Sequence, residues 1–497
     1  MIYILDFGSQ YTKLIARRIR EMGVKADILP FNTDCRRLKK AKGIILSGGP
    51  SSVYEKDAPL PNKCIYHLNI PVLGLCYGLQ AIVHMNGGVV GKGTEREYGP
   101  AMFKKVRDPL FYRIPDVSRV WMSHGDRVEN LPEGFVPIGS TKSSPYAAIK
   151  RGKIYGLQFH PEVSHTEFGQ KILQNFVFRI CAAEKDWDVE EQLKEAKREL
   201  KRVKTHAILA LSGGVDSTVC AVLARKFIPG KFTPYLVDTG LLRKDEAKEV
   251  VEYLNTIGVK VNVIDASDEF LRALKGVKDP EKKRKIVGKK FIEVFERETG
   301  KGDYLIQGTL YPDRIESAQI PGPSQVIKSH HNVGGLPERM NLEVVEPLKE
   351  LFKDEVRRIA RALKIPERIY GRHPFPGPGL SVRIIGEVNR RRLDILREAD
   401  YIYINMLREE GLYNRIWQAF AVLVPVRTVG VMGDFRTYEY LIALRAVVSE
   451  DGMTAEPFEF PHGFLQRVGS EIINRVRGVN RVVYDVSSKP PSTIEWE

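Results

Sequence analysis

The sequence contains little cysteine and no long apolar run, and each absence excludes a class of protein. Its five cysteines are scattered over 497 residues, with no Cys-x-x-Cys pair and no histidine-rich ligand spacing. We therefore expect free thiols, no disulfide framework and no structural zinc. No stretch approaches the roughly 18 uninterrupted apolar residues of a membrane span, and the first residues lack the pattern of a secretory signal. The chain is predicted to be soluble and cytoplasmic, with no membrane partner.

Low-complexity composition and an acidic charge balance are also missing. Glycine and proline, 42 and 29 residues, make up about one residue in seven, far below the roughly 25–30% of low-complexity chains. At 497 residues the chain exceeds the roughly 250–300 residues of a single core, so several domains are expected. A net charge of +15 favours an anionic partner such as a nucleotide, a nucleic acid or a phospholipid surface. Because no aromatic-rich RNA-binding signature accompanies the cations, a solvated basic surface explains most of them equally well.

The order of apolar runs predicts an α/β protein of three domains. Short strands alternate with helical periodicity through residues 1–186, as in an α/β domain with a mainly parallel sheet. A charge-rich segment from Ala183 to Lys204 should form an exposed helix that leads into a second such domain, residues 187–372. Proline and glycine crowd together near residue 375, after which strands mix with amphipathic helices. We predict a smaller α+β domain over residues 373–497.

One stretch, residues 319–341, has no periodicity and is rich in glycine, proline, histidine and asparagine. It is longer than the roughly 12–15 residues usual for a loop without secondary structure. Its His330 and His331 have no carboxylate or cysteine at the spacing of a metal site. We therefore expect a mobile lid whose histidines contact phosphate.

A cysteine stands between two glycines where a strand is predicted to end and a helix to begin. Gly74 and Gly78 permit the sharp turn of a nucleophile elbow around Cys76, and the helix N-terminus favours the thiolate. Far along the chain, another strand ends at His160-Pro161-Glu162, where both polar side chains project to one side, as a base and its orienting partner require. Strand ends meet at one edge of a parallel sheet, so we expect a cysteine nucleophile here. These residues alone would also suit another kind of cysteine hydrolase.

These motifs resemble those of the class I glutamine amidotransferases. The resemblance implies that Cys76 attacks the side-chain amide of glutamine, that His160 passes a proton to the departing ammonia, and that Glu162 orients His160. It gives the backbone N–H groups of Gly49 and Tyr77 to the oxyanion. It assigns glutamine binding to Gln80 and to the run Ser123-His124-Gly125-Asp126, above all to Ser123 and His124.

A second motif follows a predicted strand at residue 211 and opens a helix. Its small residues let backbone N–H groups form an anion nest at the positive end of the helix, and Asp216 can help to hold Mg²⁺ between phosphates. The motif is not a Walker A loop, and a plain glycine-rich turn is the alternative. It is similar to the PP-loop of the ATP pyrophosphatases, which cleave ATP between its α and β phosphates. That resemblance implies ATP binding by Ser212, Gly213, Gly214, Val215, Asp216, Ser217 and Thr218.

Over essentially its whole length the chain resembles the glutamine-hydrolysing GMP synthases, a family of carbon–nitrogen ligases. The longest matches are Asp6–Tyr11, Gln307–Asp313, Lys328–Gly335 and Lys489–Glu497. The resemblance implies that ATP, with Mg²⁺ and no organic prosthetic group, adenylates XMP, and that ammonia from glutamine then displaces AMP to give GMP. It also implies an adenine-nucleotide α-hydrolase-like second domain and a C-terminal domain that forms a homodimer. It assigns XMP binding to Arg284, Lys489 and Glu495.

Two other functions remain open on the sequence. A tRNA-modifying PP-loop enzyme would suit the net charge of +15, although no paired catalytic cysteine accompanies the PP-loop. A nucleotide-binding scaffold without catalysis would not need Cys76, His160 and Glu162. We expect small-molecule substrates and no nucleic-acid partner.

Overall fold

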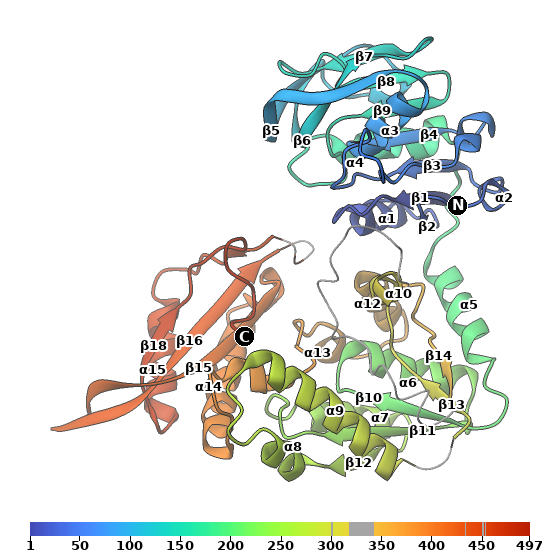
Figure 1. Cartoon of the computed structure of the whole chain (residues 1–497). Helices are drawn as coiled ribbons and strands as arrows, with labels where there is room; N and C mark the ends of the chain where they lie inside the picture. Colours follow the sequence, from blue (N-terminus) through green and yellow to red (C-terminus); the bar gives the residue numbers. More distant parts are fainter. Residues whose placement is uncertain (300–301, 318–341, 433, 450–451, 453) are drawn as a thin grey trace. The chain divides into compact units, whose positions relative to one another are not determined.

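The computed structural model describes residues 1–299, 302–317, 342–432, 434–449, 452 and 454–497 (Figure 1). Of these, residues 1–192 and 314–317 form one compact unit, and the others form a second. The predicted lid with His330 and His331 lies outside the described residues. Within the described ranges, no helix is long and apolar enough to cross a membrane.

The first unit is built on a nine-stranded sheet with the order β2-β1-β3-β4-β9-β8-β7-β5-β6. The five strands from β2 to β9 are parallel, which confirms the predicted α/β class, and the pairs beyond β9 are antiparallel. The parallel strands are β1 (Ile2–Asp6), β2 (Ala26–Pro30), β3 (Gly43–Leu46), β4 (Val72–Leu75) and β9 (Ile154–Leu157). The antiparallel strands are β5 (Val89–Lys105), β6 (Val117–Asn130), β7 (Val136–Ser140) and β8 (Ala148–Arg151).

Amphipathic helices cover the parallel strands of this sheet. Helix α1 packs on β1 and β2 through buried Leu14, Ile15 and Ile19, and Gly23, at φ +82°, follows where the helix was predicted to end. Helix α3 packs on β4 and β9. The helical segments of this unit are α1 (Thr12–Glu21), α2 (Cys35–Leu38), η1 (Lys63–His67), α3 (Tyr77–Met85), η2 (Pro109–Phe111), α4 (Gly169–Gln174) and η3 (Asn175–Ile180). Helix α5 (Val189–Leu200) begins in this unit and continues into the second.

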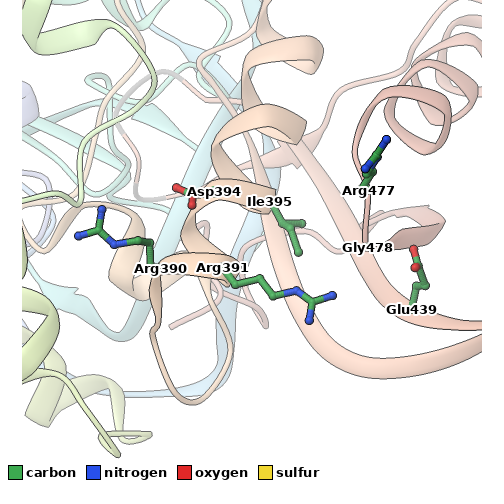
Figure 2. Close-up of a pocket in the computed structure, with 7 residues that line it drawn as sticks. All are labelled: Arg390, Arg391, Asp394, Ile395, Glu439, Arg477 and Gly478. Carbon is green, nitrogen blue, oxygen red and sulfur yellow. The ribbon is translucent and has the colours of Figure 1, made fainter.

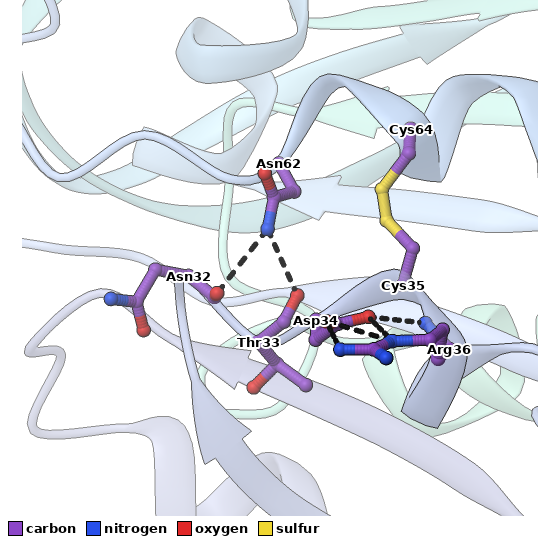
Figure 3. Close-up of a disulfide and its surroundings, with 7 residues drawn as sticks. All are labelled: Asn32, Thr33, Asp34, Cys35, Arg36, Asn62 and Cys64. Carbon is purple, nitrogen blue, oxygen red and sulfur yellow. Dashed lines mark hydrogen bonds and ion pairs between the residues drawn. A yellow bond between two sulfur atoms is a disulfide. The ribbon is translucent and has the colours of Figure 1, made fainter.

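Cys35 and Cys64 form a disulfide, so the prediction of five free thiols is wrong for this pair (Figure 3). Cys35 begins α2, Cys64 lies in η1, and their Cα atoms are 6.3 Å apart, within the usual range for a disulfide. The side-chain amide of Asn62 donates to two backbone carbonyls just before α2, which holds the two segments together. The pairing joins positions 29 apart that share no spacing motif, so the sequence pattern does not reveal it. The other three cysteines are free and buried.

The second unit contains two sheets that share one hydrophobic core. A five-stranded parallel sheet has the order β12-β11-β10-β13-β14, and a second sheet joins the antiparallel strands β15, β16 and β17 to β18, which runs parallel to β16. Buried apolar side chains connect them continuously, from Ile208 on β10 to Val479 on β18. The core therefore has no break at the predicted boundary near residue 372, and the division into 187–372 and 373–497 stays a prediction.

The strands of the second unit are β10 (Ala207–Leu211), β11 (Phe232–Asp238), β12 (Asn262–Asp265), β13 (Tyr304–Ile306), β14 (Glu343–Val345), β15 (Gln418–Met432), β16 (Phe435–Val448), β17 (Glu456–Pro457) and β18 (Val479–Tyr484). Its helical segments are α6 (Val215–Phe227), α7 (Glu246–Thr256), α8 (Ser267–Ala273), α9 (Pro280–Glu298), α12 (Lys353–Ala362), α13 (Glu367–Tyr370), η4 (Gly379–Arg383), α14 (Arg390–Glu409), η5 (Tyr413–Arg415) and α15 (Phe464–Arg475). Helix α10 (Tyr311–Ser317) includes residues of both units.

The helix expected from Ala183 to Lys204 is shorter and less exposed than predicted. Helix α5 starts only at Val189, and its Ala196 and Leu200 are completely buried. These two apolar residues are four positions apart and therefore lie on the same face of the charged helix, which is its buried face.

Candidate active site

Cys76 lies at the sharp turn between β4 and α3. Its φ of +52° and ψ of −106° are unusual for a residue with a side chain. A Cβ atom on Gly74 would lie 2.5 Å from the backbone carbonyl carbon of Gly78, and one on Gly78 would lie 2.4 Å from the carbonyl oxygen of Leu46. Only glycine fits at both positions, so the local sequence accounts for the tight elbow around the thiol.

His160 and Glu162 follow β9, the parallel neighbour of β4. Both side chains are buried, and Nδ1 of His160 lies 2.7 Å from Oε1 of Glu162. The hydroxyl of Thr166 donates to the carbonyl of His160 over 2.6 Å, and Nε of Arg18 donates to the carbonyl of Glu162 over 3.1 Å. These bonds fix the backbone that carries the pair.

The charge of His160 is set by its buried neighbours. Burial disfavours the imidazolium, but the carboxylate of Glu162 and the adjacent Cys76 outweigh it and raise the pKa of His160 to about 10. His160 therefore carries a proton at neutral pH beside the sulfur of Cys76. This arrangement suits a thiolate nucleophile with a proton donor next to it.

Two other residues contact the sulfur of Cys76. The sulfur of Cys76 lies 3.6 Å from the carbonyl oxygen of Ser123 and 3.9 Å from the side-chain amide nitrogen of Gln158. Gln158 is completely buried, and it stands directly after β9. Gln158 was not predicted from the sequence, although its place between a buried strand and His160 is a signal that could have indicated it.

The loop that precedes the candidate oxyanion position of Gly49 is closely packed. A Cβ atom on Gly49 would lie 2.6 Å from the carbonyl oxygen of Phe7, and one on Gly48 would lie 3.2 Å from Cε1 of His160. The hydroxyl of Ser47 accepts from the Phe7 N–H over 3.0 Å and donates to the Gly48 carbonyl over 2.8 Å. The glycine loop therefore borders the imidazole of His160.

Tyr77, the other candidate for the oxyanion, is the first residue of α3, next to Cys76. Its hydroxyl donates to the carbonyl of Pro59 over 2.8 Å, which anchors the ring away from its own backbone N–H. That N–H belongs to the first turn of the helix, where backbone donors lack partners within the helix.

A buried polar network surrounds two of the residues predicted to bind glutamine. The two ring nitrogens of His124 lie 2.9 Å from the carbonyl oxygen of Asp126 and 3.1 Å from Oε2 of Glu97, and burial lowers the pKa of His124. The side chain of Gln80 donates to the same Asp126 carbonyl over 3.0 Å. The Asp126 carboxylate accepts from the hydroxyl of Tyr54 over 2.9 Å and also bonds the hydroxyl of Ser52. Asp126 belongs to the run predicted to help bind glutamine, whereas Glu97 was not predicted from the sequence.

The predicted PP-loop connects β10 to α6 in the second unit. Gly213 has a φ of +80°, and Thr218 donates to the carbonyl of Gly214 over 2.8 Å. The N–H of Ser212 donates to the hydroxyl of Ser217 over 3.2 Å, which closes the loop on the first turn of α6. The loop thus has the small residues and fixed backbone that an anion nest requires.

Asp216 fits the cation that was predicted at this loop. It lies half-buried in the first turn of α6, and its buried Oδ1 has no hydrogen-bond partner among the described residues. Burial raises the pKa of Asp216, the Lys353 ammonium opposes this shift, and the nearby Asp313 carboxylate adds to it. An unpartnered carboxylate oxygen beside a second carboxylate is a suitable environment for Mg²⁺.

Arg372 supports the PP-loop and was not found from the sequence. Its guanidinium is almost completely buried, donates to the carbonyl of Gly213 over 3.1 Å and bonds the carboxylate of Glu249 over 2.5 Å. Because the carbonyl of Gly213 is held from one side, its peptide plane is fixed. No spacing rule connects Arg372 to a loop about 160 positions earlier.

The three residues predicted to bind XMP lie on two segments of the second unit. Arg284, on α9, donates to Glu281 over 2.5 Å, and Lys489 donates to the carbonyl of Gly452 over 2.7 Å. Glu495 accepts two bonds from Arg383, of 3.0 and 2.8 Å. In the described part of the chain, no hydrogen bond directly joins Arg284, Lys489 and Glu495 to each other.

A separate cavity of about 490 Å³ contains none of the predicted site residues (Figure 2). Its lining includes the carboxylates of Asp394 and Glu439 as well as arginines. Arg390 and Arg391 point in opposite directions in Figure 2, and Arg390 is paired with Asp268. The guanidinium groups therefore do not converge on one anion. The lining residues are Arg390, Arg391, Asp394, Ile395, Glu439, Arg477 and Gly478.

The parallel sheet of the first unit, its cysteine elbow and the His160–Glu162 pair define a class I glutamine amidotransferase. Residues 3–180 match the family model for class-I glutamine amidotransferases, and residues 405–496 match the model for the GMP synthase C-terminal domain. The chain is 57% identical to the glutamine-hydrolysing GMP synthase of Aquifex aeolicus, with 100% of this chain and 99% of that protein covered. The corresponding proteins of Thermosipho melanesiensis and Pelodictyon phaeoclathratiforme are 54% and 55% identical, with the same coverage. The chain belongs to the glutamine-hydrolysing GMP synthase family.

Proposed function

We propose that this protein converts XMP, ATP and glutamine into GMP, AMP, pyrophosphate and glutamate. The observation that carries the proposal is that one chain combines a protonated histidine beside a strained cysteine with a PP-loop, in a family named for this reaction. The first site releases nitrogen from an amide. The second activates an oxygen atom so that this nitrogen can replace it.

In the first step, the thiolate of Cys76 attacks the side-chain amide carbon of glutamine. The oxyanion that forms is bound by the N–H groups of Gly49 and Tyr77. The His160 imidazolium gives its proton to the departing ammonia and then takes one from the water that hydrolyses the thioester, while Glu162 stabilises its charge.

The polar network beside the thiol has a supporting role in this proposal. Both ring nitrogens of His124 face protein oxygen atoms, and the amide of Gln80 already donates to a protein carbonyl. These side chains would therefore hold the part of β6 from Ser123 to Asp126, and the backbone carbonyl of Ser123 reaches the sulfur of Cys76. Glutamine binding would then depend on the course of this part of the strand.

In the second unit, the backbone N–H groups of Ser212–Thr218 bind the phosphates of ATP. O2 of XMP attacks the α-phosphorus and pyrophosphate leaves, so that ammonia can displace AMP from C2 of the purine. Asp216 would hold Mg²⁺, which neutralises phosphate charge when it is bound. Arg284, Lys489 and Glu495 would bind XMP, whose phosphate suits guanidinium and ammonium groups.

A homodimer is part of the proposal, supported by exposed apolar side chains on the β15–β16 hairpin. We call the following set the hairpin patch: Val426, Val429, Val431, Phe435 and Tyr438, which are 54–78% exposed. Val429 and Tyr438 are direct cross-strand partners, so they lie with Val431 on one face of the hairpin, whereas Phe435 lies on the other face near its tip. Exposed apolar surface of this kind is typical of an interface. A cytoplasmic location stays a prediction.

The test is to identify the products that the purified full-length protein makes from XMP, ATP, Mg²⁺ and glutamine. GMP together with AMP is expected, because adenylation leaves AMP after amination. Formation of ADP, or tight salt-dependent tRNA binding without turnover of XMP, would contradict the proposal.

Two substitutions test which site carries out each half-reaction. Cys76→Ala should lower glutamine-dependent GMP synthesis by about 10³-fold or more and leave ammonia-dependent synthesis intact, because only the nucleophile is lost. Asp216→Ala should abolish synthesis from both nitrogen sources. Asp268→Ala, which removes an exposed surface ion pair of the same unit, is the matched control and should behave like the wild type.

A further inference from the structure

Three completely buried cations of the second unit bind the same segment, Asp485–Glu497. They are Lys283 on α9, Arg383 in η4 and Arg445 on β16, each with a side chain that is 0% exposed. A buried charge costs several kcal/mol unless it is paired and hydrogen-bonded. The convergence of three such charges on one segment therefore calls for an explanation.

The guanidinium of Arg445 holds both arms of a loop. Nη1 donates to the carbonyl of Ser487 over 2.6 Å, and Nη2 donates to the carbonyl of Thr493 over 3.3 Å. Weaker bonds of 3.3 to 3.5 Å reach Asp485 and Ser492. These partners stand on either side of Lys489, so Arg445 sets the course of the backbone that carries Lys489.

Lys283 attaches the other end of the segment to α9. Its ammonium pairs with the side-chain carboxylate of Glu497 and donates to the carbonyls of Ser381 and Ile384, over 3.1 and 2.7 Å. The same carboxylate accepts from the N–H of Gly386 over 3.0 Å. Lys283 directly precedes Arg284, so one helix carries both Arg284 and the anchor of the segment.

A contribution to the stability of the fold does not by itself explain why three buried cations contact this segment. Well-packed apolar residues stabilise a core at least as well as buried ion pairs. Apart from one backbone bridge between Lys489 and Ala455, the segment 485–497 has no regular helix or strand, so the rest of its backbone must be fixed by other groups if its side chains are to be held in place. Cations that bind backbone carbonyls on both arms of the loop supply this constraint.

We infer that Arg445 and Lys283 are positioning residues that fix the segment Asp485–Glu497 in the geometry that binds XMP. The inference rests on the proposed function, because it assumes that Lys489, Glu495 and Arg284 contact XMP. Neither positioning residue touches the substrate. Each acts through the segment, Arg445 on the backbone around Lys489 and Lys283 through Glu497.

The test measures ammonia-dependent GMP synthesis by the full-length variants Arg445→Met and Lys283→Met as the XMP concentration is varied. Each variant should raise the KM for XMP about tenfold or more and change kcat less than about twofold, because binding geometry is lost while the ATP site is intact. The KM for ATP should be unchanged. Arg445→Lys should not rescue binding, since one ammonium cannot bond both arms of the loop.

Arg467→Met is the matched control. It removes an exposed arginine of the same unit, which pairs with Glu410 over 2.5 Å and lies over the ring of Phe464, and it should leave the KM for XMP unchanged.

Fluorescence gives a second readout that does not depend on turnover. The indole N–H of Trp496 donates to the carboxylate of Asp485 over 2.9 Å, so this ring reports on the segment. Iodide should quench Trp496 more strongly in Arg445→Met than in the wild type. The same measurement on each protein with the additional substitution Trp496→Phe gives the signal of the other tryptophans, which is then subtracted.

An XMP KM within twofold of the wild type in folded Arg445→Met and Lys283→Met would overturn the inference. A lower kcat with unchanged KM and unchanged quenching would also overturn it, because that result indicates partial unfolding alone. If Arg445→Met does not fold, Lys283→Met and Glu497→Gln test the inference instead. Both substitutions break the same ion pair, so their effects on the KM for XMP should not add in the double variant. Additive effects would contradict the inference. If the wild-type protein does not turn over XMP, the proposed function is wrong. The quenching experiment would still show whether Arg445 fixes the segment Asp485–Glu497.

Discussion

The buried pair His160 and Glu162 links the protonation of one side chain to both activity and stability. The pKa of His160 is raised from 6.5 to about 10, although burial alone would lower it, because Glu162 and Cys76 favour the imidazolium. A pKa that is higher in the folded state means that folding is stabilised when His160 is protonated. This contribution is fully present below pH 6.5 and is lost as the pH rises through about 10.

Glu162→Gln should remove most of this effect. Without the carboxylate charge the pKa of His160 falls, so the pH-dependent part of the free energy of unfolding is lost at lower pH than in the wild type. Glutamine hydrolysis should fall by roughly 10²- to 10⁴-fold, since the imidazolium loses its orienting partner. Urea unfolding from pH 6 to pH 10 and a glutaminase assay measure the two changes.

The control for this variant is Glu167→Gln, a nearby exposed carboxylate that accepts from the backbone N–H of Arg119 over 3.3 Å. It should keep wild-type activity. Wild-type activity in Glu162→Gln would mean that the carboxylate does not support His160.

At the scale of elements, the turn between β4 and α3 depends on two backbones that approach closely. Gly78 faces the carbonyl of Leu46 on β3, where a methyl group would lie only 2.4 Å from the oxygen. Gly78→Ala should push α3 away from the sheet, with a loss of about 1–3 kcal/mol in stability and about 10²-fold or more in glutaminase activity. Thermal unfolding and the rate of thiol alkylation at Cys76 would record the shift.

Gly288→Ala is the matched control for the turn. Gly288 is exposed in the middle of α9, and a Cβ atom there would meet nothing within 4 Å. Alanine should stabilise this helix slightly, because glycine costs about 1 kcal/mol in a helix interior. If both alanine variants left the protein unchanged, close packing at the elbow would not matter.

Elements with a strong local signal could be predicted from the sequence. Strands β4 and β10 lie where strands are predicted, before the cysteine turn and before the PP-loop, because each is an apolar run that ends at a glycine-containing turn or loop. The thiol site was predicted for the same reason, since Cys76 follows β4 directly and His160 comes three residues after the end of β9. Contacts between residues that are far apart in the sequence could not be predicted, because no local sequence pattern indicates them. Examples are the Cys35–Cys64 disulfide and the hydrogen bonds of Arg445 to backbone carbonyls.

The whole molecule combines two chemistries on one chain, and its second unit has one continuous core. Because apolar contacts run unbroken from Ile208 to Val479, the C-terminal sheet stabilises the sheet that carries the PP-loop, and the reverse holds as well. The part of the second sheet that projects beyond this core is the hairpin that bears the hairpin patch. Its exposed apolar groups have no partner within the core and gain most from association.

Val431→Asp and Phe435→Asp should therefore shift the protein from dimer to monomer. These two side chains are the most exposed of the hairpin patch, at 72% and 78%, and a carboxylate in an apolar interface is unpaired and desolvated. Light scattering after size-exclusion chromatography, over a range of concentrations, should show dissociation at concentrations at least about tenfold higher than for the wild type. Val263→Asp, at a valine 52% exposed on β12, is the matched control and should keep the wild-type mass. A wild type that is monomeric throughout, or aspartate variants that keep its mass, would show that the hairpin patch is not the interface.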